Sequence, residues 1–155
     1  MITYAKSWFR AKKRVTEPWD EARARLAHER KETYVATVYR DEDLHCFLEI
    51  AKGSVCVGIL DELKREYLTY TFQLFQPDKL FLSSARHRKF EGETDNVSYS
   101  TIFYFKQEGR VTVAEYDGRT KESSSKESAE KIDLSKNWED YPEFGKYDSL
   151  IRLER

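Results

Sequence analysis

The sequence contains few of the residues that mark several classes of protein. Its 155 residues include two cysteines, three prolines and six glycines. No stretch approaches the roughly 20 consecutive apolar residues of a membrane-spanning helix. The basic run Lys12-Lys13-Arg14 interrupts the region where a secretory signal would carry its apolar core. These absences predict a cytoplasmic protein that does not associate with membranes.

The two cysteines are predicted to be reduced. Residues 44–50 and 55–60 alternate in the manner of a β-hairpin around a turn at 51–54. Pairing Ile50 with Val55 places Cys46 on the apolar face and Cys56 on the opposite face. Side chains on opposite faces of a sheet do not meet the geometry of a disulfide. Cys46 is therefore expected to be a small core residue.

Sequence patterns of catalysis and metal binding are missing. The three histidines, His28, His45 and His87, are far apart, and no H-x-x-x-H or C-x-x-C spacing occurs. There is also no glycine-rich phosphate loop and no G-x-S-x-G elbow. The sequence therefore predicts a protein that is not an enzyme and that uses no metal or cofactor.

The most regular pattern is a pair of β-hairpins between residues 67 and 116. Apolar residues alternate with polar ones in 67–75, and a turn at Gln76-Pro77-Asp78 follows. The register that keeps one face apolar pairs Leu74 with Leu80 and Phe72 with Leu82. In the second hairpin a loop ending in Gly109 follows residues 98–106, and the same reasoning pairs Phe105 with Val111 and Phe103 with Val113.

The segments on either side of these hairpins set the expected fold. Tyr4 and Trp8 lie four residues apart, and the stretch from Thr16 to Lys31 carries a helix start and an apolar stripe, so residues 1–31 are predicted to be helical. Residues 33–116 are predicted to form an antiparallel meander of about seven strands. Residues 117–131 are polar and serine-rich, which predicts a flexible loop or, alternatively, the frayed start of a helix. Residues 132–155, which we call the C-terminal strap, are rich in aromatic and acidic residues.

Together these segments predict a single domain, 1–155, of α+β class, with N-terminal helices packed on the sheet and the C-terminal strap crossing it. A closed β-barrel with a helical lid is the alternative.

Charge is nearly balanced overall but not locally. The net charge of −1 disfavours a uniformly basic nucleic-acid binder. The run Arg86-His87-Arg88-Lys89 nevertheless forms a basic cluster that could contact phosphate groups. Aromatic residues of the sheet could then stack on bases; the candidates are Tyr70, Tyr99, Phe103 and Tyr104. A single-stranded nucleic-acid-binding module is therefore one candidate function, and the competing interpretation is a solvated strand end with an aromatic core behind it.

The C-terminal strap offers a second candidate surface. Trp138, Glu139, Asp140, Tyr141 and Glu143 combine large aromatic side chains with carboxylates. Trp and Tyr are frequent anchors of protein interfaces, and acidic neighbours attract a basic partner. These five residues are predicted to bind a partner protein, and the competing interpretation is that they only stabilise the fold.

The chain as a whole resembles the immunity proteins of bacterial polymorphic toxin systems, including contact-dependent growth inhibition. The resemblance rests on a predicted Trp-bearing N-terminal helix, a long antiparallel meander and the run from Asn137 to Gly145. It implies a protein that binds a cognate toxin domain, for example a nuclease, and blocks it sterically. A barrel that holds a small apolar ligand is a third candidate function. The sequence does not specify the oligomeric state.

Overall fold

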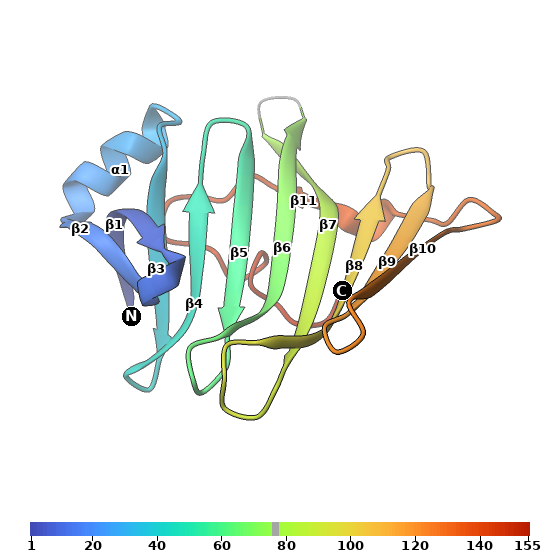
Figure 1. The fold of residues 1–155 in the computed structure, drawn as a ribbon. Coiled ribbons are helices and arrows are strands. Elements are labelled where there is room, and N and C mark those ends of the chain that lie inside the picture. The colour runs from blue at the N-terminus through green and yellow to red at the C-terminus, as the bar shows by residue number, and fades with distance from the viewer. Residues whose placement is uncertain (76–77) are drawn as a thin grey trace.

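A computed structural model describes residues 1–75 and 78–155. In these residues the chain forms eleven β-strands, one α-helix and two 3-10 turns (Figure 1). The strands are β1 (Ile2–Phe9), β2 (Arg14–Trp19), β3 (Tyr34–Arg40), β4 (Asp43–Ile50), β5 (Ser54–Leu60), β6 (Glu66–Phe75), β7 (Lys79–Phe90), β8 (Val97–Phe105), β9 (Val111–Asp117), β10 (Glu122–Glu127) and β11 (Trp138–Asp140). The helix is α1 (Glu21–Glu29), and the turns are η1 (Arg10–Lys12) and η2 (Ser135–Asn137).

All eleven strands belong to one antiparallel sheet. Its order is β10-β9-β8-β7-β6-β5-β4-β3-β1-β2, and β11 pairs with the start of β7. From β3 to β10 each strand pairs with the next one along the chain, which makes a long meander. The sheet is open: β10 lies at one edge and β2 at the other (Figure 1).

The three predicted hairpin registers are confirmed. Leu48 pairs with Val57 and Cys46 with Ile59 between β4 and β5. Phe72 pairs with Leu82 between β6 and β7, and Phe103 with Val113 between β8 and β9. The turn predicted at 76–78 falls partly on residues 76–77, which lie outside the described residues. Apolar alternation therefore determines the pairing of these strands.

The predicted α+β class is wrong, and so is the barrel alternative. Residues 2–9 and 14–19 form β1 and β2 in place of helices, and the one α-helix of the described residues begins only at Glu21. The i, i+4 spacing of Tyr4 and Trp8 fits a strand as well as a helix, because four is also a multiple of two. Residues 117–131 are not simply a loop, since they contain β10, which carries serines and charges because it lies at the sheet edge.

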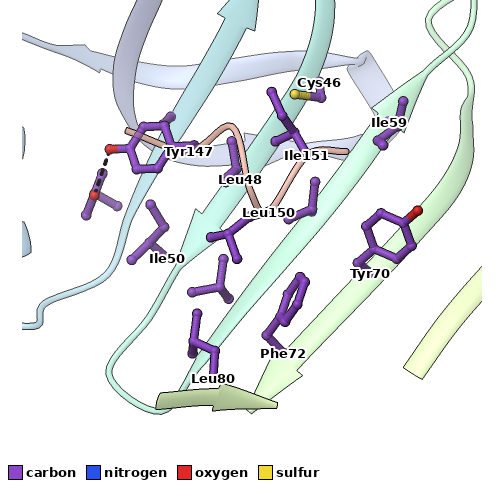
Figure 2. Packing of buried hydrophobic residues seen from close by; sticks show 14 of the residues in the cluster. Cys46, Leu48, Ile50, Ile59, Tyr70, Phe72, Leu80, Tyr147, Leu150 and Ile151 are labelled. Atoms are coloured by element: carbon purple, nitrogen blue, oxygen red, sulfur yellow. Dashed lines mark hydrogen bonds between the residues drawn. The ribbon is translucent and has the colours of Figure 1, made fainter. Parts of the chain in front are cut away.

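The two faces of the sheet differ in what covers them. One face, which we call the strap face, carries the row Leu48, Val57, Tyr70 and Ala85. In Figure 1 the C-terminal strap runs behind the sheet along this face. Figure 2 shows Tyr147, Leu150 and Ile151 of the strap packed against strap-face residues, and helix α1 adds Ala24 and Ala27. The strap and the helix thus complete the main hydrophobic core.

The opposite face, which we call the open face, carries Phe47, Thr69 and Arg86. Only its β3–β5 half is well covered. There Trp8 stacks on Phe47 with ring centroids 4.6 Å apart, and Arg10 lies over the same ring. The end of β1 and the turn η1 therefore cover one half of the open face. Most of the half between β6 and β10 stays accessible, except at Phe81, which is buried beneath the Trp138 ring. No helix among the described residues is long and apolar enough to cross a bilayer.

A buried polar chain joins helix, sheet and strap. Nδ1 of His28 and the Tyr34 hydroxyl are 2.8 Å apart, and the Tyr34 and Tyr147 hydroxyls are 3.0 Å apart. Burial raises the pKa of Tyr34 and lowers the pKa of His28. Both groups are therefore held in their neutral forms at neutral pH.

Acidification is expected to destabilise the fold through His28. In the folded state the pKa of His28 lies below its ordinary value of about 6.5. At a pH below about 6.5 the unfolded chain therefore binds a proton at His28 more readily than the folded chain does. The free energy of unfolding should not depend on His28 above pH 7 and should decrease as the pH falls from 6.5. Urea unfolding of wild type and His28→Gln between pH 7 and pH 5 measures this. The variant should show a weaker pH dependence; equal slopes would contradict the assignment. His45, whose pKa is also lowered by burial, remains in both proteins.

Candidate functional site

The accessible half of the open face is built from five neighbouring strands. A single cross-strand row on this face consists of Thr69, Arg86, Ile102, Ala114 and Ser125, one residue from each of β6 to β10. Directly opposite residues of antiparallel strands share a face, so the register fixes which side chains lie together.

The basic run 86–89 lies in β7, and the alternation of the strand divides it between the two faces. Arg86 and Arg88 lie on the open face, opposite Ile102 and Ser100 of β8. His87 and Lys89 lie on the strap face, where the His87 ring meets Tyr67 edge-on at 6.1 Å between centroids. The predicted cluster of four therefore becomes a pair of arginines on one surface.

Arg88 is fixed by neutral oxygen atoms. Its Nη1 donates to Thr69 Oγ1 at 2.8 Å and to the Glu66 carbonyl oxygen at 3.3 Å. The Glu66 carboxylate instead accepts from Thr69 Oγ1 at 2.7 Å and pairs with Nε of Arg10 at 3.3 Å. Burial lowers the pKa of Arg88, and the neighbouring Arg86 and Arg10 add to that effect. Among the described residues, Arg88 forms no ion pair with a carboxylate.

A pocket of about 420 Å³ lies beside Arg88, under the end of β1. Its lining includes Trp8, Arg10, Lys13, Arg65, Arg88 and Phe90. Lys13 pairs with Asp95 at 2.6 Å and Arg65 with Asp61 at 2.8 Å, so these two positive charges are compensated within the protein. Arg88 therefore differs from the other cations of this pocket in having no carboxylate partner.

A shallow groove of about 450 Å³ continues from Arg86 toward the sheet edge. It is lined by Arg86, Ile102, Tyr116 and the serines 123–125. Tyr104 and Tyr116 project from the open face with 45% and 39% of their surface exposed. Large exposed aromatic side chains next to arginine are the composition found at the centres of binding surfaces.

Trp138 of the C-terminal strap belongs to the same surface. It is paired with Phe81 in β7, and its ring lies 4.9 Å from the Phe81 ring and 6.1 Å from that of Phe75. Phe81 pairs with Gln73 on the open face, and Trp138 is 38% exposed. The structure therefore places Trp138 on the same face of the sheet as Arg86, although the sequence placed them in two separate candidate sites.

The other strap residues lie in different environments. Glu139 is turned toward the strap face, where its carboxylate accepts hydrogen bonds from Arg152 at 2.6 Å and Arg155 at 3.0 Å; only 11% of its side chain is exposed. Tyr141 packs on the ring of His28, and its buried hydroxyl has no partner among the described residues. Glu139 therefore joins β11 to the end of the strap, and Tyr141 packs the strap against helix α1.

Asp140 and Glu143 are exposed and each is paired with a lysine. Asp140 pairs with Lys79 at the start of β7, and Glu143 pairs with Lys146 at 2.5 Å. Exposed pairs of this kind stabilise a fold by at most about 1 kcal/mol and exchange readily for a partner's charges.

Sequence reasoning missed Tyr116 as a site residue. It also proposed Tyr70, Tyr99 and Phe103 as stacking residues together with Tyr104. The register places those three on the strap face and Tyr104 with Tyr116 on the open face. Applying the hairpin alternation to residues 110–116 would have identified Tyr116.

The described residues contain no group of three or more histidine, cysteine or acidic side chains placed to hold a metal ion. Comparisons of the chain with models of protein families, with curated proteins and with solved structures gave no significant match.

Proposed function

We propose that this protein neutralises a cognate toxin domain by binding it with the open face of the sheet. The observation that carries the proposal is that Arg86, Tyr104, Tyr116 and the strap residue Trp138 all lie on the open face, where the two tyrosines and Trp138 are exposed. Trp, Tyr and Arg are the side chains that most often dominate binding energy in protein interfaces. The class of partner follows from the resemblance to immunity proteins.

Steric occlusion requires a rigid surface more than reactive groups. The sheet supplies rigidity because each of these residues lies on a strand paired on at least one side, and Trp138 is held against two further aromatic rings. Binding to a preformed surface loses less conformational entropy than ordering a loop does. The toxin surface is expected to carry carboxylates, which would complement Arg86 and Arg88.

A pull-down with the tagged protein tests this function. The lysate should contain the expressed C-terminal domain of whatever large gene lies directly upstream of this one. A one-to-one complex and protection of cells that express the toxin domain are expected. Trp138→Ala should weaken the complex about 30-fold, the loss of a binding hot spot. Leu26→Ala, an exposed apolar residue on α1, is the matched control and should leave the affinity unchanged. A toxin domain that neither binds nor is inhibited would contradict the proposal.

A second candidate function is binding of single-stranded nucleic acid. It is favoured by the position of Arg86, Arg88, Tyr104 and Tyr116 on one face, since arginines contact phosphates and aromatic rings stack on bases. Fluorescence anisotropy with labelled oligonucleotides tests it. Affinity should fall steeply with salt, and Arg86→Gln should lower the salt slope by about 1. Absence of binding at low salt would eliminate this candidate.

A further inference from the structure

The two edges of the sheet differ in how well they are protected against pairing with another chain. At the β2 edge, Pro18 removes a backbone donor and Glu17 has a φ of 45°, so regular pairing is interrupted. Strand β10 has neither a proline nor a residue with positive φ, and all six of its residues are exposed. An unprotected edge of this kind is a template for a further strand.

The register of β10 on β9 determines which backbone groups point outward. The Ser128 amide donates to the Val111 carbonyl at 2.8 Å, one position beyond the Glu127–Thr112 pair. Because the hydrogen-bonding direction alternates along an antiparallel strand, Glu122, Ser124 and Lys126 also point their backbone groups toward β9. Ser123, Ser125 and Glu127 therefore direct their amides and carbonyls away from the sheet.

We propose that β10 pairs antiparallel with β10 of a second copy of this chain, with Ser124 opposite Ser124 at the two-fold axis. In an antiparallel pair, residues whose backbone groups point toward the other strand lie opposite one another. In the allowed registers, Ser123 or Ser125 of one copy therefore lies opposite Ser123, Ser125 or Glu127 of the other. A register centred on Lys126 would set two lysines face to face. The register centred on Ser124 sets Lys126 opposite Glu122 of the second copy, and this happens twice by symmetry.

Charge complementarity selects that register. Within residues 1–75 and 78–155, neither Lys126 nor Glu122 forms an ion pair, so both are available to the second copy. A register centred on Ser125 would place Lys126 opposite Ser124 and lose both pairs. Opposite charges directly across an antiparallel pair stabilise it, and like charges destabilise it.

The pairing would join two sheets into one with both open faces on the same side, because the two-fold axis runs perpendicular to the sheet. Ser123 and Ser125, which line the groove beside Arg86 and Tyr116, would lie next to the same groove of the second copy. The dimer would then present two copies of the candidate site to one surface, which is an arrangement that increases apparent affinity for a repeated partner.

Sedimentation equilibrium over a range of protein concentrations tests the pairing. Wild type should associate reversibly to a dimer. Lys126→Glu and Glu122→Lys should each shift the protein to the monomer, and the double variant Glu122→Lys/Lys126→Glu should recover the dimer. Lys12→Glu, a charge reversal at an exposed lysine in η1, is the control and should not affect association. A wild type that stays monomeric at the highest concentration, or a double variant no better than the single ones, would overturn the proposal.

Single cysteines test the register independently. The Cα atoms of a directly opposite pair without hydrogen bonds are about 4.5 Å apart, which a disulfide can bridge. Ser124→Cys should therefore form a disulfide-linked dimer on mild oxidation, and Ser125→Cys should not. The reverse result would overturn the register. The native thiols should not interfere, since burial raises the pKa of Cys46 to about 12 and that of Cys56 to about 11.

Discussion

Leu150→Ala is expected to lower the free energy of unfolding by about 2–5 kcal/mol. Leu150 is fully buried, and Figure 2 shows it among Leu48, Ile50 and Phe72 on the strap face. Truncation to alanine removes apolar contacts and leaves a cavity that strands held on both sides cannot close. Urea unfolding monitored by tryptophan fluorescence or circular dichroism measures the effect.

The matched control lies three residues further along the strap. Leu153 is 51% exposed, and Leu153→Ala should change the free energy of unfolding by less than about 0.5 kcal/mol. If Leu150→Ala lowered the free energy of unfolding no more than Leu153→Ala does, the strap would not form part of the core.

Gly58→Ala is expected to cost about 1–3 kcal/mol, although it adds only a methyl group. A Cβ atom at Gly58 would lie 2.3 Å from Cζ of Phe47, whose ring lies across β5 on the open face. Trp8 stacks on the same ring and Arg10 lies over it, so Phe47 cannot easily move aside. The same unfolding measurement in urea tests this expectation.

A second substitution shows whether the Phe47 ring causes the destabilisation expected for Gly58→Ala. Phe47→Leu is itself destabilising because it shortens a buried side chain, but it removes the ring atoms that the methyl group added at Gly58 would meet. The two changes should therefore be less than additive when combined. If the two losses of unfolding free energy were strictly additive, the destabilisation by Gly58→Ala would not arise from contact with the Phe47 ring.

The sheet could be predicted from sequence where apolar and polar residues alternate in both strands of a hairpin. The pairs Ile50–Val55, Leu74–Leu80 and Phe105–Val111 follow from keeping one face apolar, and all three are present. The N-terminal region could not be predicted in the same way. Residues 1–19 form β1 and β2, the last two strands toward the β2 edge of the sheet, where polar and charged residues obscure the period.

The candidate site was predictable only in part. Arg86 and Trp138 were singled out for their chemistry, but they lie far apart in the chain. Only the pairing of β11 with β7, a contact made by three residues, brings them to one face. Glu139 differs from its neighbours because β11 turns it to the strap face, which no local pattern of charge or aromatic residues could indicate.

The measurement that tests the binding face most directly compares two neighbouring residues of β8. Tyr104 lies on the open face and is 45% exposed, whereas Phe103 lies on the strap face and is 37% exposed. The dissociation constant for the toxin domain should rise about 30-fold in Tyr104→Ala and stay within about twofold of wild type in Phe103→Ala. A larger loss in Phe103→Ala than in Tyr104→Ala would contradict binding through the open face.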